Sequence, residues 1–204
     1  MTVRRRFHAL VKAFILGACI IPLIHLIARA NGLGDLGANP IQEVLHTLGK
    51  TGLNLTLITL MITPLRKETN FYWLVSLRRM LGLSAFFYAL LHALTYVALD
   101  QGFMWSSLYI YVTQRPYITL GALALLIMIP LAITSTKASQ RRLGRIWKKL
   151  HRLIYLIASL GVLHFFLQAK IDVAEPIIYS IALLLLLGYR ANTWLKRQQA
   201  TRKQ

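Results

Sequence analysis

The sequence has very little acidic charge and almost no cysteine. Of 204 residues only 6 are Asp or Glu, and Cys19 is the single cysteine. One cysteine excludes an internal disulfide, a cysteine-rich zinc site and an iron–sulfur cluster. The apolar runs also contain no pair of carboxylates and no nucleophile–base set. No catalytic site of these kinds is therefore expected within the chain.

What the sequence has in excess is apolar length and basic charge. The chain is 56% hydrophobic and carries 24 Lys and Arg residues, which gives a net charge of +18. The apolar residues come in long blocks, and the basic residues cluster between the blocks, which is typical of a polytopic membrane protein. A nucleic-acid-binding domain would gather its basic residues on one face. Membrane lipid is therefore the expected partner, and nucleic acid is not.

The apolar blocks predict six transmembrane helices in one domain covering residues 1–204, an all-α integral membrane bundle. The spans are expected at about 10–29, 46–65, 80–99, 117–135, 150–168 and 175–190. The first could be a signal peptide ending at Ala28-Arg29-Ala30, but its length favours a retained helix. Loops are expected elsewhere, including the aromatic segment 100–116 and the basic segment 137–152, and no internal repeat is evident.

The loop at 31–45 contains a literal G-x-G-x-x-G between Gly32 and Gly37. That pattern binds dinucleotides only after a strand and before a helix. Here a membrane helix precedes it, so we interpret the glycines as turn residues.

Basic charge predicts the orientation of the bundle. With both termini cytoplasmic, the inner segments hold 20 of the 24 basic residues. Cytoplasmic loops of membrane proteins are enriched in Lys and Arg. The four expected outside are Arg29, Lys50, Arg115 and Lys170.

Histidines inside the spans are candidate functional residues, because an ionisable side chain within a membrane needs a partner or a role. His92 and His164 lie on the third and fifth spans, which run in the same direction. Each is roughly 18–21 Å from the cytoplasmic end at about 1.5 Å per residue. Two imidazoles at equal depth on separate helices suit two axial ligands of one haem iron. His25 is a rival at similar depth, whereas His151 lies roughly 20 Å from His164.

Other interpretations of these residues stay open. His164 could simply bind a neighbouring helix, and His151 could lie among interfacial lysines. The histidines could also form a proton relay in a transporter. Arg78, Arg79 and Arg152 could set topology and contact lipid headgroups, or pair with haem propionates or a flavin phosphate.

Four stretches of the sequence resemble the MsrQ (YedZ) family of ferric-reductase-like transmembrane proteins. They are RRMLGLSAFFYALLHALTY at 78–96, TQRPYITLG at 113–121, TSTKASQRRLGRIWKKLHRLIYL at 134–156, and LHF around His164. The resemblance covers essentially the whole chain. It implies a six-helix haem bundle in the bacterial inner membrane, built from the ferric-reductase-like transmembrane domain.

The resemblance also implies a function. The family passes electrons from quinol or a cytosolic flavin reductase to MsrP, a periplasmic molybdopterin enzyme that reduces methionine sulfoxide in proteins. Haem b is its cofactor, FMN binding has been ascribed to it, and its ligand histidines map onto His92, His151 and His164. Arg78 and Arg79 stand where an inner ligand of the third helix is expected, which leaves a second haem open. A stand-alone ferric or cupric reductase of the same fold is an alternative, because a fold does not determine the electron acceptor.

Overall fold

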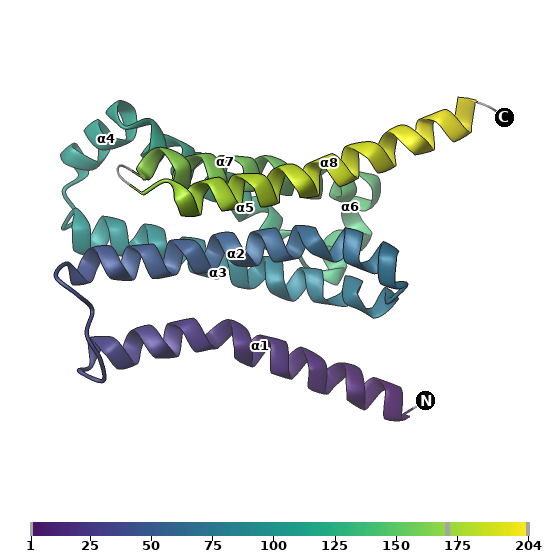
Figure 1. The fold of residues 1–204 in the computed structure, drawn as a ribbon, viewed down its shortest axis with the longest axis horizontal. Helices are drawn as coiled ribbons and strands as arrows, with labels where there is room; N and C mark the ends of the chain where they lie inside the picture. The colour runs from purple at the N-terminus through teal and green to yellow at the C-terminus, as the bar shows by residue number, and fades with distance from the viewer. Residues whose placement is uncertain (1, 170–171, 203–204) are drawn as a thin grey trace.

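The computed structural model describes residues 2–169 and 172–202, and within them every regular element is helical (Figure 1). The elements are α1 (Thr2–Ala30), α2 (Pro40–Thr69), η1 (Tyr72–Leu77), α3 (Arg78–Thr95), η2 (Tyr96–Asp100), α4 (Trp105–Gln114), α5 (Pro116–Ile133), α6 (Lys137–Leu150), η3 (His151–Leu153), α7 (Ile154–Gln168) and α8 (Ala174–Arg202).

The long helices run up and down beside one another (Figure 1). α1 begins and α8 ends at the same end of the bundle, where the basic helix α6 also lies, and α4 lies at the opposite end. We call these the basic end and the α4 end. Because α3 and α7 both start at the basic end, they run in the same direction, as the predicted topology requires.

Five helical segments are long and apolar enough to cross a membrane: Arg6–Ala30, Tyr72–Asp100, Pro116–Ile133, Lys137–Gln168 and Ala174–Ala200. The remaining expected span, 46–65, lies inside α2, which has 30 residues but includes Lys50 and Asn54. Large apolar side chains cover the outside, such as Phe14 (79% exposed) and Leu185 (70% exposed). Such a surface suits lipid rather than water. The chain is a multi-pass membrane protein; a sixth span through α2 stays a prediction.

Two segments expected as loops are helices. Residues 105–114 form α4, with Trp105 and Tyr109 exposed as an interfacial aromatic belt requires. The basic segment forms α6, capped by Thr136, whose side chain accepts from the Ser139 amide. Lys, Arg, Gln and Leu are good helix formers, and nothing but Gly144, with φ of 49°, interrupts them. For the same reason α8 continues beyond the expected end at 190, since no Gly or Pro follows Gly188 before its end.

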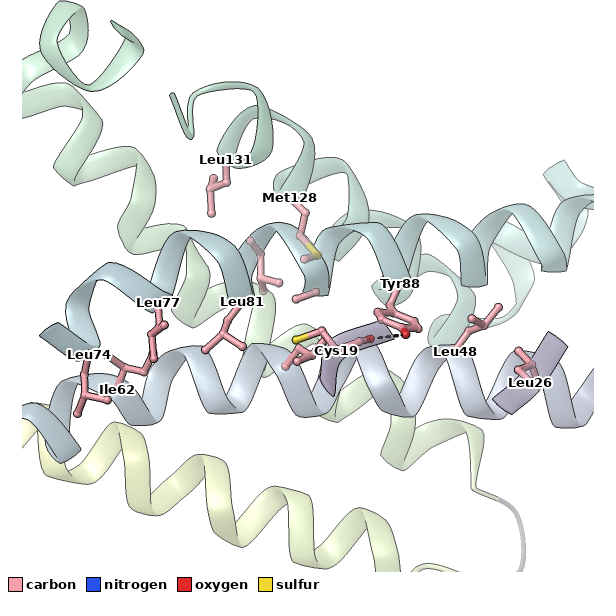
Figure 2. Close-up of a cluster of buried hydrophobic side chains, with 13 residues drawn as sticks. Cys19, Leu26, Leu48, Ile62, Leu74, Leu77, Leu81, Tyr88, Met128 and Leu131 are labelled. Atoms are coloured by element: carbon pink, nitrogen blue, oxygen red, sulfur yellow. Dashed lines mark hydrogen bonds between the residues drawn. The ribbon is translucent and has the colours of Figure 1, made fainter. Parts of the chain in front are cut away.

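α1 lies at the edge of the bundle and packs against it through two buried residues. Its Cys19 and Leu26 are buried against α2 and α3, together with Leu48 and Leu81 (Figure 2). Tyr88 of α3 donates from its hydroxyl to the Cys19 carbonyl at 2.6 Å. Cys19 is therefore a packing residue, as its isolation in the sequence predicts.

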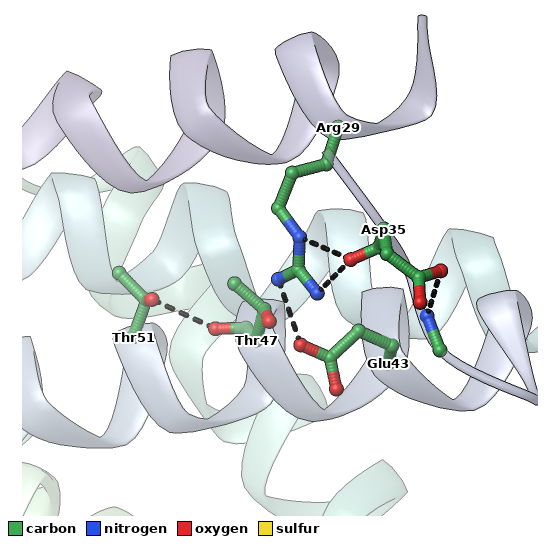
Figure 3. Close-up of polar contacts among 6 residues, drawn as sticks. Arg29, Asp35, Glu43, Thr47 and Thr51 are labelled. Atoms are coloured by element: carbon green, nitrogen blue, oxygen red, sulfur yellow. Dashed lines mark hydrogen bonds and ion pairs between the residues drawn. The ribbon is translucent and has the colours of Figure 1, made fainter. Parts of the chain in front are cut away.

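The α1–α2 connection is held by Arg29. Its guanidinium pairs with Glu43 at 2.9 Å and donates through Nε to the Asp35 carbonyl at 2.8 Å (Figure 3). Gly32, Gly34 and Gly37 all have positive φ, so they make turns, as interpreted from the sequence. The motif follows a helix and no strand flanks it in the described chain, so it is not a dinucleotide fingerprint.

Candidate functional site

The structure brings His92 of α3 and His164 of α7 together in the interior of the bundle. Their ring centroids are 6.1 Å apart, and the ring planes are inclined at 82°. Both residues lie in the half of the bundle nearer the α4 end, because each sits late in a helix that starts at the basic end. Equal depth on two parallel helices is therefore realised as direct proximity.

Each imidazole is oriented by a backbone carbonyl of a neighbouring helix. His92 Nδ1 lies 2.9 Å from the Leu45 carbonyl of α2, and His164 Nδ1 lies 2.6 Å from the Tyr117 carbonyl of α5. A carbonyl oxygen only accepts, so Nδ1–H must donate in both contacts. The lone pair of each neutral ring is then on Nε2. In the described chain neither Nε2 has a hydrogen-bond partner, so both are free to coordinate a metal.

A glycine makes room for each ring. A Cβ added at Gly49 of α2 would lie 3.1 Å from His92 Nδ1, and one added at Gly121 of α5 would lie 2.9 Å from His164 Nδ1. Each ring is thus wedged between a carbonyl acceptor and a bare glycine of the helix beside it. This arrangement fixes both the tautomer and the direction of the ring.

The two halves of the site repeat one another. The tripeptide Thr-Leu-Gly ends at Gly49 and again at Gly121, and a histidine follows each glycine by 43 residues (92 minus 49, 164 minus 121). The carbonyl acceptors Leu45 and Tyr117 both lie four residues before their glycine. No internal repeat was expected, but the α2–α3 and α5–α7 pairs hold their histidines in the same way, with a carbonyl acceptor and a glycine at matching spacings. The repeat was visible in the sequence as these two Thr-Leu-Gly tripeptides.

The donor set fits a haem iron better than a bare metal ion. Among the described residues no group of three or more His, Cys, Asp or Glu side chains could hold a metal ion. A porphyrin supplies four nitrogens itself and needs only axial ligands from the protein. Metal–imidazole bonds are about 2.0–2.1 Å long. His92 and His164, with ring centroids 6.1 Å apart, would supply two such ligands from neighbouring helices.

The structure gives His151 different partners. It begins η3 at the basic end, where its Nε2 lies 3.1 Å from the Thr134 hydroxyl and its ring stacks on Trp147 at 4.0 Å. Its separation of 13 residues from His164 corresponds to roughly 20 Å of helix. His151 is therefore not brought to the His92–His164 pair.

The remaining intramembrane histidines also lie outside the pair. His25, the rival at similar depth, is exposed on α1. His46 follows Leu45 and makes an edge-to-face contact with Phe165 at 6.4 Å, so it flanks the pair. Depth alone could not separate these residues, because it says nothing about which way a side chain points around its helix.

The sequence of this chain is similar to those of known proteins. The family model described as ferric reductase like transmembrane component matches residues 47–162, which include Gly49, His92, Gly121 and His151. A protein-methionine-sulfoxide reductase heme-binding subunit MsrQ from Rhodospirillum rubrum is 46% identical over 186 residues, covering 91% of this chain and 89% of that protein. The chain belongs to the MsrQ family.

Other relatives carry the same name. MsrQ of Xanthomonas campestris pv. campestris strain 8004 is 48% identical over 83% of this chain and 78% of its own length. MsrQ of Azospira oryzae is 44% identical over 88% of this chain and 78% of its own length. The resemblance stated from the four sequence stretches is thereby confirmed for the family.

The arginines expected near the inner ligand position point in different directions. Arg78 is half-buried and donates to the Thr63 hydroxyl of α2, whereas Arg79 is exposed. Arg79 is also the residue that the repeat aligns with His151 (151 minus 79 equals 72, as 164 minus 92 does). Thus α3 has an exposed arginine at the position where η3, just before α7, has a histidine.

Sequence reasoning missed Arg190 of α8. This residue donates to the Tyr155 and Thr63 hydroxyls and to the Leu60 carbonyl, and its guanidinium lies 4.7 Å from the centre of the Tyr155 ring. It was counted only as topogenic charge. In the sequence Arg190 stands at the end of an apolar run, and that position does not distinguish a half-buried arginine from an exposed one.

Proposed function

We propose that this chain is a membrane electron-transfer subunit that holds one haem b between His92 and His164. The observation that carries the proposal is the pair of adjacent imidazoles, each with Nδ1 bound to a carbonyl and with no hydrogen-bond partner for Nε2 among the described residues. The names of the relatives, which describe heme-binding subunits of a methionine-sulfoxide reductase, support the same cofactor.

The residues of the chain perform three tasks in this function. His92 and His164 hold the iron, and the carbonyls of Leu45 and Tyr117 orient the rings and raise their basicity as ligands. The surrounding apolar helices exclude water and lower the local dielectric constant, which tunes the reduction potential. When bound, the haem supplies one-electron chemistry, and the protein determines where in the membrane that chemistry takes place.

The proposed acceptor is MsrP, the periplasmic molybdopterin enzyme that reduces methionine sulfoxide during protein repair. With both termini cytoplasmic in the bacterial inner membrane, the His92–His164 pair lies in the periplasmic half of the bundle, which shortens the distance to that acceptor. This orientation rests on the predicted positive-inside asymmetry and on the two ends of the chain lying at one end of the bundle.

The proposed electron donors are quinol or a cytosolic flavin reductase. The described residues form no strand–helix unit of the kind that binds a nicotinamide, which supports a donor of another class. We further propose that the chain binds FMN and that His151 holds a second haem. His151 would have to exchange its Thr134 contact for iron.

The test uses the purified protein in lipid nanodiscs with the purified molybdopterin reductase and methionine sulfoxide. Wild-type protein should be red. Its reduced haem, followed by the Soret band, should be reoxidised in full only when both the reductase and its substrate are present. His164→Ala is the matched control, because it should lack the low-spin haem needed for the reaction.

Two results would contradict the proposal. Colourless protein that moves protons would favour the transporter with a histidine relay. Red protein that is reoxidised by ferric or cupric salts, and not by the molybdopterin reductase, would favour the stand-alone metal reductase.

A further inference from the structure

Two arginines converge on one threonine near the basic end of the bundle. Arg78 at the start of α3 and Arg190 of α8 both donate to the Thr63 hydroxyl of α2. Both side chains are half-buried. Like charges placed so close repel one another, and a low local dielectric constant strengthens the repulsion. Such a pair is stable only if something nearby compensates the charge.

The described residues do not supply that compensation. Their ion pairs are Arg29–Glu43 and Lys50–Glu175, and both lie toward the α4 end. Glu68, the acidic residue at the basic end, accepts a hydrogen bond from the Tyr189 hydroxyl at 2.6 Å and pairs with neither arginine. The Nε atoms of Arg78 and Arg190 are buried and have no hydrogen-bond partner among the described residues. Two donors are thus buried with no acceptor beside them.

A groove of about 500 Å³ is lined by Arg190 and by Thr63, the residue to which Arg78 donates. Arg78 itself does not line it. The groove is formed by the end of α2, the middle of α8, η3 and the start of α7, and its polar side includes Thr63, Arg152, Tyr155 and Arg190. Leu187 and Trp194 of α8 form an apolar side. The groove therefore joins guanidinium and hydroxyl donors to an apolar wall on the surface of a membrane helix.

We propose that this groove binds the phosphate of an anionic membrane phospholipid. Guanidinium groups present several donors in a planar fork that suits phosphate oxygens. Basic pockets between transmembrane helices near the cytoplasmic face bind anionic headgroups. The acyl chains lie along the apolar side formed by α8, and the phosphate supplies the negative charge that the two arginines lack. This site is separate from the histidine pair and does not depend on the proposed electron transfer.

The experiment measures lipid-dependent stability on the full-length protein in neutral detergent. The probes are phosphatidylglycerol, phosphatidylcholine of the same chain length, and inorganic phosphate, each titrated while Tm is followed. A ligand that binds the folded state raises Tm. Wild-type protein should be stabilised by phosphatidylglycerol at concentrations at which the other two have no effect.

Variants locate the binding. Arg190→Gln should weaken the apparent affinity for phosphatidylglycerol about tenfold or more, because a hydrogen bond to a charged group contributes at least that factor. Arg78→Gln should weaken it less, because Arg78 reaches the groove only through Thr63. Arg142→Gln, which removes an exposed charge of α6 outside the groove, should bind as wild type does. If Arg190→Gln does not fold, Tyr155→Phe and Arg190→Lys serve in its place, since both keep the bulk and remove a donor.

Three results would overturn the proposal. Equal stabilisation by phosphatidylcholine would show that charge is not recognised. Wild-type affinity in the Arg190→Gln variant would place any lipid elsewhere. Stabilisation by inorganic phosphate equal to that by phosphatidylglycerol, and lost in the same variants, would assign the groove to a soluble phosphate compound and not to lipid.

Discussion

Gly121 offers a sharp perturbation of the histidine pair. An alanine Cβ at this position would lie 2.9 Å from His164 Nδ1 and 3.1 Å from its Cε1. Ordinary contact starts at 3.4 Å, so the ring must retreat by 0.5 Å (3.4 minus 2.9). The helix backbone of α5 cannot yield easily, because the Tyr117 carbonyl four residues earlier binds the same ring. Gly121→Ala should therefore displace His164 along its coordination direction.

The expected effect is larger on the haem than on the fold. Overpacking a core costs about 1–3 kcal/mol, and replacing a helical glycine by alanine returns about 0.5–1 kcal/mol. The net loss of stability is therefore small, at about 0–2.5 kcal/mol. The displaced ligand, by contrast, should lower haem occupancy and shift the low-spin electron paramagnetic resonance signal. Gly49→Ala should act in the same way but more weakly, since its Cβ would lie 3.1 Å from His92 Nδ1.

Gly82→Ala is the matched control. Gly82 is on α3, the helix of His92, but a Cβ there meets nothing within 4 Å. This variant should keep the wild-type haem signal and be neutral or more stable by about 0.4–1 kcal/mol. Haem content and absorption at the Soret band measure occupancy, and thermal unfolding measures stability. If Gly121→Ala keeps wild-type haem content and an unchanged low-spin signal, the wedge between carbonyl and glycine does not orient His164.

Three further outcomes are expected. A reporter that is active only in the periplasm, fused after Gln204, should be silent, and activity there would overturn the predicted orientation. NADPH alone should not reduce the haem of pure protein, whereas NADPH with a flavin reductase should; rapid reduction by NADPH alone would reveal a nucleotide site. Arg29→Gln should lower the free energy of unfolding by about 1 kcal/mol or more, since it removes hydrogen bonds to Glu43 and the Asp35 carbonyl. Arg142→Gln should leave the free energy of unfolding unchanged. Equal unfolding curves for the two variants would refute this role of Arg29.

The sequence predicted the helices better than their connections. The span expected at 80–99 corresponds to α3 and η2, because an apolar run in a membrane has few structures available to it. The loops 100–116 and 137–152 are largely helical, because polarity marks where a chain leaves the membrane but not whether it remains helical there. The start of α6 at Lys137 depends on the Thr136 cap, and a threonine before a helix-forming segment is a signal that the sequence contains.

The depth of each histidine along its helix identified the His92–His164 pair better than residue type alone did. His92 and His164 meet because equal rise on parallel helices places them at one level, which the sequence determines once topology is assumed. The same argument admitted His25, which is exposed on α1, because rotation about the helix axis depends on packing. The carbonyl acceptors are 47 residues away from their histidines, and such pairing appears only when the helices are assembled.

The most direct test of the central claim is haem ligation in three alanine variants, His92→Ala, His164→Ala and His151→Ala, read by absorption and electron paramagnetic resonance. The account predicts that losing His92 or His164 removes the haem or leaves it five-coordinate. Losing His151, which binds Thr134 near the basic end, leaves the low-spin signal of the pair intact. A full bis-imidazole signal in the His92 variant, together with loss of all haem in the His151 variant, would contradict the account.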